Sequence, residues 1–223
     1  MVAIVPGGER LVAITDDPLT GPAPSAPPAL IGSLEPAPHQ DRQPDGRPAI
    51  PSIHPDAWIA PGAVVVGSVT IGPDSSVWYN AVLRADDDQI FIGEQCNIQD
   101  LCCLHVDAGE PVRLEPRVSL GHHATVHGAH IEEGALIGMG AVVLGGARVG
   151  AGSLIAAGAV VLPGQGIPPG VLFAGVPGRV VRDLRDPDRE RIEHTWRGYV
   201  DRARRHQEAR WHREARWHQV RPE

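Results

Sequence analysis

The chain has 223 residues, a formal net charge of −7 and 20 basic residues, all of them Arg. This acidic balance argues against a nucleic-acid partner, and no apolar run approaches the roughly 20 residues that a membrane span requires. Hydrophobic residues make up 42% of the chain but aromatic residues only 4%, so we expect a core of small aliphatic side chains.

The first 48 residues are rich in proline. Nine prolines fall between positions 18 and 48, a density that prevents regular pairing of strands. We predict that residues 1–48 form an extended, partly disordered arm, with a local strand pair in AIVPGGERLVAI as its candidate regular element. The segment MVAIVPGGER lacks the basic start and the long apolar region of a signal peptide, and the odd number of Cys fits a reducing compartment, so we expect a cytoplasmic location.

From Ile53 onward an aliphatic residue recurs at every sixth position, with three interruptions. These positions are Ile53, Ile59, Val65, Ile71, Val77, Leu83, Ile92, Ile98, Leu104, Leu114, Leu120, Val126, Ile131, Ile137, Val143, Val149, Ile155, Val161 and Ile167. A second, mostly small residue follows four positions after most of them. This period is the signature of hexapeptide repeats, in which each repeat supplies a short strand and a turn and stacked neighbours share one core.

We therefore predict an all-β solenoid, a left-handed parallel β-helix of hexapeptide repeats, over residues 49–181. Solenoids of this repeat take three hexads per triangular coil and wind left-handed, against the usual crossover rule. An ordinary β-sandwich, the alternative fold, does not predict a strict period of six. In this register Cys96 and Cys102 belong to the second set of mostly small residues, which point inward, and we expect them to be buried core thiols. Cys103 does not point into the core, and we assign it no role.

Residues 182–223 follow a helical pattern instead. One apolar face with the spacing of an amphipathic helix is formed by Ile192, Trp196, Tyr199 and Ala203. The Arg-rich opposite face, with Trp211 and Trp217, is also compatible with a membrane or nucleic-acid surface. We favour a C-terminal α-helix that packs along the solenoid and keeps its charged side in water.

The repeat register stacks two histidines on one face of the solenoid. Counting hexads places Leu83, Leu104 and Val126 one above another, each one coil apart. The residues that directly follow them are Arg84, His105 and His127. All three point outward because side chains alternate along a strand, and adjacent coils lie about 4.8 Å apart. The two imidazoles can therefore share one metal ion, with the guanidinium on the next coil.

His122 lies in a different column, one coil from Asp100 and on another face. It cannot easily reach His105 and His127 of its own chain, whereas in a three-fold assembly the face of one subunit meets an edge of the next. A metal site shared between subunits would explain the odd, five-residue gap between His122 and His127. Two His from one chain and one from a neighbour leave an open coordination position, as in catalytic zinc sites.

Four segments resemble the gamma-class carbonic anhydrases and their close relatives, over about residues 50–200. The segments are VWYNAVLRADDDQIFIGEQCNIQDLCCLHVD, GHHATVHG, GALIGMGAVVL and IPPGVLFAGVPGRVV. They contain the motifs R-x-D, N-x-Q-D, L-H-V-D and G-H-x5-H-G in that order. The resemblance implies a trimeric left-handed β-helix with Zn2+, or in some members Fe2+ or Co2+, held by three His between subunits.

The motifs assign the family's site residues to positions in this chain. The implied metal ligands are His105, His122 and His127. The implied catalytic residues are Arg84 and Asp86 from R-x-D, and Asn97, Gln99 and Asp100 from N-x-Q-D. In the family these side chains order the metal-bound water, the bicarbonate and an Arg–Asp pair across the interface. Tyr199 is similar to the Tyr that the C-terminal helix lends to the pocket.

The chain departs from the family pattern in two places. Most relatives have R-G-D and G-H-[RK] where this chain has R-A-D and G-H-H, and these changes keep the functional residues. Only 16 residues separate His105 from His122, so the acidic loop that carries a proton-shuttle Glu in the best-characterised members is missing, and Asp87 is the candidate substitute. His123 and His130 fit neither column, and we interpret them as ordinary surface histidines.

Our leading hypothesis is the reversible hydration of CO2 by a gamma-type carbonate dehydratase, a lyase. Three neutral imidazoles leave a bound zinc ion cationic, which lowers the pKa of its water towards neutrality, as carbonic anhydrases do. Gln99 would orient the hydroxide, while Arg84 and Asp100 would hold the interface. The rival hypotheses are thioesterase or acyltransferase chemistry on acyl-CoA, and a non-catalytic scaffold subunit with a structural metal. We expect a homotrimer that takes CO2 and bicarbonate and binds neither nucleic acid nor membrane.

Overall fold

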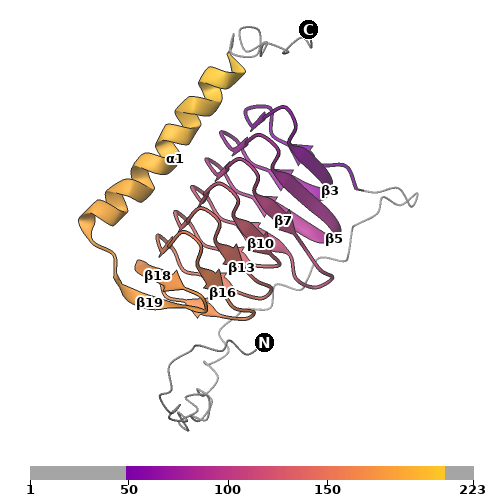
Figure 1. Ribbon diagram of the computed structural model, residues 1–223. Helices are drawn as coiled ribbons and strands as arrows, with labels where there is room; N and C mark the ends of the chain where they lie inside the picture. Colours follow the sequence, from indigo (N-terminus) through magenta and orange to yellow (C-terminus); the bar gives the residue numbers. More distant parts are fainter. Residues whose placement is uncertain (1–48, 209–223) are drawn as a thin grey trace, which may run out of the picture. The chain divides into compact units, whose positions relative to one another are not determined.

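The computed structural model describes residues 49–208. The predicted arm of residues 1–48, its strand pair, and Trp211 and Trp217 lie outside this range. The described residues form the predicted left-handed parallel β-helix, a solenoid of about seven coils followed by one C-terminal helix (Figure 1).

Three parallel sheet faces make up the solenoid. The first face consists of the start of β3 (Val64–Ile71), the start of β5 (Val82–Ile92), β7 (Cys103–His105), β10 (Thr125–His127), β13 (Val142–Val143) and β16 (Val160–Val161). The second consists of β1 (Ser52–Ile53), the ends of β3 and β5, β8 (Val112–Leu114), β11 (His130–Ile131), β14 (Arg148–Val149) and β17 (Gly166–Ile167). The third consists of β2 (Trp58–Ile59), β4 (Ser76–Val77), β6 (Asn97–Ile98), β9 (Ser119–Leu120), β12 (Leu136–Ile137), β15 (Leu154–Ile155), β18 (Val171–Gly175) and the antiparallel β19 (Gly178–Asp183).

The recurring aliphatic residues point inward and form the core. From Ile71 to Ile167 each of them is at most 4% exposed, whereas Ile53, in the first coil, is 41% exposed. The strand register places Leu104 beside Leu83 on one side and beside Val126 on the other. The hexad count made on the sequence is therefore confirmed.

A residue in the left-handed backbone region follows three positions after most of the core aliphatic residues. From Gly134 to Gly170 this residue is always Gly, with φ between 61° and 69°. In the preceding coils it is Asp74, Asn80, Gln95, Leu101, Arg117 and His123, with φ between 55° and 62°. His123 therefore occupies a corner of the solenoid. This corner carries the chain from the third face, next to His122, to the first face and His127, and it accounts for their five-residue gap.

The three cysteines are free, and the structure places them as the repeat register indicates. Cys96 and Cys102 are buried, as predicted, and Cys103 is exposed. Loss of hydration raises the pKa of both buried thiols to about 12.

We expect a disulfide reagent at about pH 8 to modify no more than one thiol per native chain, because the thiolate is the reactive form. All three thiols should react after unfolding in denaturant. Mass spectrometry of the modified peptides provides the measurement. Modification of Cys96 or Cys102 in native protein would contradict the burial of these side chains.

The C-terminal helix α1 spans Asp186–Gln207. It begins later than the predicted position 182, because β19 continues to Asp183. The carboxylate of Asp188 accepts a hydrogen bond from the Arg185 backbone N–H at 2.9 Å and two from the Arg182 guanidinium, at 2.6 and 3.3 Å. The Arg182 hydrogen bonds are the largest cause that lowers the pKa of Asp188, to about 2. This cluster fixes the first turn of α1 to the last coil.

From there α1 runs back along the third face, where it contacts β2, β4, β6 and β9 (Figure 1). On its predicted apolar face Ile192 and Ala203 are buried, and Trp196 and Tyr199 are half-buried. Ile192 packs with Leu136 and Leu154 of the third face. No helix within residues 49–208 is long and apolar enough to cross a bilayer.

Candidate metal centre

The first face carries the two stacked histidines. β7 and β10 pair so that His127 lies beside His105, and β5 places Arg84 on the other side of His105. Nδ1 of His105 lies 3.0 Å from Nε2 of His127. The two side chains are 17% and 31% exposed. Their nitrogens therefore meet at the surface of the solenoid and not in its core.

This donor pair fits a metal ion. Two nitrogens that bind one tetrahedral Zn2+ at about 2.0–2.1 Å are roughly 3.3 Å apart, which is close to the 3.0 Å between the two imidazoles. The other ring nitrogen of His105, Nε2, lies 3.0 Å from Oδ1 of Asp86. A carboxylate behind a ligating His fixes the orientation and the tautomer of its ring. Asp86 is therefore placed to orient a ligand.

Two interruptions of the six-residue period bring acidic side chains to this site. Extra residues enlarge the corner between the first and second faces, at Asp86–Asp88 within β5 and at Asp107–Glu110 after β7. Oδ2 of Asp88 accepts a hydrogen bond from the Gly109 N–H at 2.9 Å and ties the two corners together. The result is a row of carboxylates beside the histidine pair.

Arg84 keeps one of these carboxylates charged. Its guanidinium forms an ion pair with Asp86. Partial desolvation favours the neutral carboxyl group, but hydrogen bonds from Arg84, from the Asp86 backbone and from His105 outweigh it and lower the pKa of Asp86. Asp86 is consequently an anion at neutral pH and a steady hydrogen-bond acceptor for His105.

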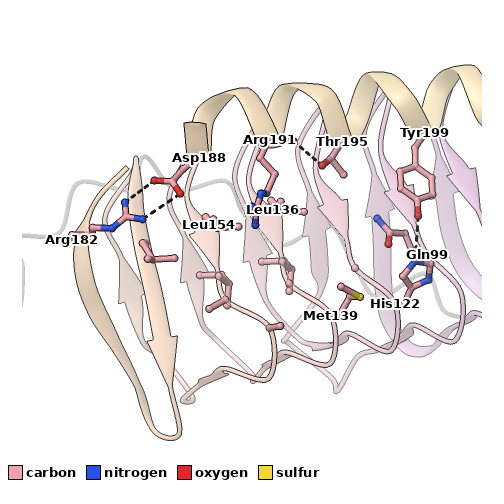
Figure 2. Close-up of a pocket in the computed structure, with 17 residues that line it drawn as sticks. Gln99, His122, Leu136, Met139, Leu154, Arg182, Asp188, Arg191, Thr195 and Tyr199 are labelled. Atoms are coloured by element: carbon pink, nitrogen blue, oxygen red, sulfur yellow. Dashed lines mark hydrogen bonds and ion pairs between the residues drawn. The ribbon is translucent and has the colours of Figure 1, made fainter. Parts of the chain in front are cut away.

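His122 lies at the corner between the third and first faces. Its Nδ1 is 2.9 Å from Oδ2 of Asp100, and its Nε2 is 3.4 Å from the hydroxyl of Tyr199 on α1 (Figure 2). Among residues 49–208, the close groupings of metal-ligating atoms are His105–Asp107–His127 and Asp86–Asp87–His105. His122 belongs to neither grouping. Within one chain the third predicted ligand is thus separate from the pair.

Asn97 and Gln99 lie on the third face, next to Asp100. Nε2 of Gln99 donates to Oδ1 of Asn97 at 3.0 Å, and Nδ2 of Asn97 donates to Oγ of Ser119 at 2.7 Å. Asn97 is 1% and Gln99 5% exposed. This chain of hydrogen bonds fixes the Gln99 amide at the edge of a groove that His122 and Tyr199 also line.

Tyr199 remains a neutral hydrogen-bond donor at this edge. Burial raises the pKa of its hydroxyl, and the nearby Asp100 carboxylate raises it further. The structure places the Tyr199 hydroxyl next to His122, the predicted third ligand.

The other predicted residues are distributed around this centre. Asp87 is exposed, beside Asp86 and within reach of His105. Inside one chain Arg84 pairs with Asp86 and Asp100 with His122, so the predicted Arg84–Asp100 pair is not formed within the chain. His130 lies on the second face, 3.1 Å from Glu115, and away from the first-face histidines.

Two residues of the site, Asp107 and Ser119, were not predicted from the sequence. Oδ2 of Asp107 lies 3.9 Å from Nε2 of His127, and Ser119 holds Asn97. Asp107 lies beyond the end of β7, in the enlarged corner, so the six-residue period gave no direction for its side chain. Ser119 could have been found by counting one coil on from Asn97, since β6 and β9 pair these two residues.

Comparison with known proteins agrees with this fold. The family model for the bacterial transferase hexapeptide (six repeats) matches residues 51–85 and 128–163. A protein of Methanocaldococcus jannaschii named "Probable carbonic anhydrase" is 56% identical over 142 residues, which are 64% of this chain and 89% of that protein. Gamma carbonic anhydrase 2, mitochondrial, of Arabidopsis thaliana is 36% identical over 162 residues, which are 70% of this chain and 58% of the plant protein.

Among solved structures, a hexapeptide transferase family protein from Anaplasma phagocytophilum superposes with a TM-score of 0.67 at 32% identity. The superposition covers 69% of this chain and 91% of that protein. The relatives thus include proteins named as carbonic anhydrases and proteins named as transferases. From the repeat, the ordered motifs and these identities we conclude that the chain belongs to the gamma-class carbonic anhydrase family of hexapeptide-repeat proteins.

Proposed function

We propose that this protein catalyses the reversible hydration of CO2 to bicarbonate, at a Zn2+ site shared between the subunits of a homotrimer. Fe2+ and Co2+ are the alternative metals. The observation that carries the proposal is the convergence of His105 Nδ1 and His127 Nε2, with Asp86 behind the first ring. The relatives named as carbonic anhydrases support the substrate.

The proposed site needs one ligand from a second chain. His105 and His127 of one subunit supply two nitrogens, and His122 of a neighbour supplies the third, which leaves one coordination position open for reaction. Asp100 holds Nδ1 of His122, so that Nε2 is the nitrogen available to a metal. These three histidines would hold the ion, which would supply the activation of water for attack on CO2.

The remaining residues have roles that follow from their contacts. The Asn97–Gln99 hydrogen-bond chain holds the Gln99 amide rigid, so Gln99 is proposed to orient the attacking water. Within one chain the Tyr199 hydroxyl lies 3.4 Å from Nε2 of His122. A metal bound at Nε2 would use the lone pair that this hydroxyl now meets, so the role proposed for Tyr199 is to close the site on the side of α1. Arg84 is proposed to bind bicarbonate and to meet Asp100 across the interface, in addition to its ion pair with Asp86.

A CO2 hydration assay on metal-analysed protein, run over a series of imidazole buffer concentrations, tests the proposal. We expect a modest rate that rises strongly with buffer, because each cycle must export a proton and, without the acidic loop, either Asp87 or an external base has to accept it. A high rate that does not depend on buffer would refute the proposed proton route. No hydration at full metal occupancy would refute the proposed function.

Acyl transfer is the second candidate function. The names of the transferase relatives favour it, and so does the apolar groove beside His122. Hydrolysis of acyl-CoA by the same metal-analysed preparation, without hydration of CO2, would establish it in place of the first. A protein that keeps its metal but lacks both activities would be a scaffold subunit.

The assembly itself depends on Arg84 in this proposal. We expect Arg84→Ala to weaken the trimer by about tenfold or more and to lower activity, because truncating one partner of an interfacial charge pair costs about 2–5 kcal/mol. Sedimentation velocity over a dilution series measures the assembly. Arg113→Ala is the matched control. Arg113, on the second face, forms an ion pair with the carboxylate two residues further along the chain, Glu115, as Arg84 does with Asp86. An unaltered trimer in the Arg84 variant would contradict the interfacial role.

A further inference from the structure

A groove of about 530 Å³ lies between α1 and the third face of the solenoid. Successive coils form its floor, α1 forms its upper wall, and it runs from the Arg182–Asp188 cluster to Tyr199 and His122 (Figure 2). The roles proposed above use only its last part, at Gln99, His122 and Tyr199. The rest of the groove has no role in the hydration of CO2, a substrate far smaller than this volume.

The floor of the groove is aliphatic. Leu136, Leu154 and Leu172 come from β12, β15 and β18 and stack at one position of consecutive coils. At about 4.8 Å per coil they form an apolar strip about 10 Å long. Met139, which is 59% exposed, continues the apolar lining towards the corner of His122. Leu136 and Leu154 are each only 8% exposed because Ile192 of α1 already covers most of them. An alkyl chain gains free energy from the part of this lining that is still open, chiefly Met139.

The groove also contains a cation without a partner. Arg182 is paired with Asp188, but among residues 49–208 no carboxylate pairs with the guanidinium of Arg191. Figure 2 shows the Arg191 side chain extending from α1 into the groove, between Leu136 and Leu154. The hydroxyl of Thr195 donates to the Arg191 backbone carbonyl oxygen at 2.7 Å, so it is not a partner of the guanidinium.

The two ends of the stretch of groove between Arg191 and Tyr199 are chemically different. Arg191 offers a planar fork of donors that matches a carboxylate. Tyr199 is about 12 Å away along the helix axis, at roughly 1.5 Å per residue. Between them the lining is apolar except for Thr195, whose hydroxyl is already bonded. A ligand that fits has an anionic head and an unbranched apolar tail.

We propose that this groove binds a medium-chain carboxylate. The carboxylate pairs with Arg191, and the alkyl chain lies over Leu136 and Met139 and points towards His122 and Tyr199. The inference goes beyond the proposed hydration of CO2 and does not depend on it, because binding is measured without turnover. It gives the metal centre a neighbouring site for an amphipathic acid.

Titration calorimetry of the full chain with butyrate, hexanoate, octanoate and decanoate tests the proposal. We expect saturable binding that tightens by up to about fourfold for each added methylene while the chain still finds apolar surface. Arg191→Gln should weaken octanoate binding at least about tenfold, since it removes a charge-assisted bidentate contact. Arg205→Gln is the matched control, because Arg205 is an exposed position on the same helix and outside the groove.

A second variant tests the apolar end of the groove. Met139→Glu places a carboxylate in the path of the alkyl chain, so octanoate should bind at least tenfold more weakly while butyrate changes little. Met139 is exposed in the single chain but lies one coil from His122 in the same column, so sedimentation velocity first establishes that the variant has the wild-type assembly. No saturable binding to the full chain, equal binding of all four acids, or equal binding by wild type and Arg191→Gln would each overturn the proposal. CO2 hydration and metal content are measured separately, so failure of this inference can be told apart from failure of the proposed function.

Discussion

Replacement of His122 by Ala is expected to remove the metal as completely as replacement of His105 by Ala. Changes behind a metal ligand lower affinity by about 10- to 100-fold, and the loss of a ligand itself should cost more than that. His122 is not grouped with the first-face histidines in its own chain, so this equality is expected only if the site is shared between chains. Metal analysis after gel filtration measures it, and His130→Ala on the second face is the control.

A mixing experiment makes the same prediction sharper. When His105→Ala and His122→Ala chains are unfolded together and reassembled, an intact site forms wherever a chain that keeps His105 meets a chain that keeps His122. Random assembly of a three-fold oligomer from equal amounts should restore about a quarter of the metal. Recovery of no metal, or near-stoichiometric metal in the His122 variant alone, would contradict a site shared between subunits.

Replacement of Leu104 by Ala is expected to destabilise the protein by about 2–5 kcal/mol, because it leaves a cavity in a closely packed core. Leu104 is 0% exposed and lies between Leu83 and Val126 on neighbouring coils. It also directly precedes His105, so a shift of this strand moves a metal ligand and should lower metal affinity as well. Urea denaturation and metal titration measure the two effects.

Leu162→Ala is the matched control for this core substitution. Leu162 is 44% exposed, and removal of the same atoms from an exposed side chain should change stability by less than about 0.5 kcal/mol. Equal losses in the two variants would mean that the aliphatic column does not form the core in solution.

The regular part of the fold could be predicted from the sequence because each hexad repeats one physical solution. When an aliphatic residue recurs at every sixth position, all of these residues can point into one core only if the chain turns after each short strand. Counting in sixes therefore placed Leu83, Leu104 and Val126 in one column, and with them Arg84, His105 and His127.

The irregular part could not be predicted by counting. Where Asp86–Asp88 and Asp107–Glu110 add residues to a corner, the period gives no direction for their side chains. The contacts of Asp86 and Asp107 with the histidines depend on that local backbone. The position of Tyr199 depends on how α1 packs across four strands, which a helical period alone does not determine.

The path of α1 has a consequence for how the protein unfolds. A stack of repeats with contacts only between neighbours can fray from its free ends, coil by coil. Here the helix leaves the last coil through the Arg182–Asp188 pair and packs against strands of the first coils, where Ala203 lies among Trp58 and Trp78. The two ends of the array are thereby mechanically linked, and the opening of either one costs contacts made by both. The solenoid should consequently lose its structure in one cooperative step instead of by progressive shortening.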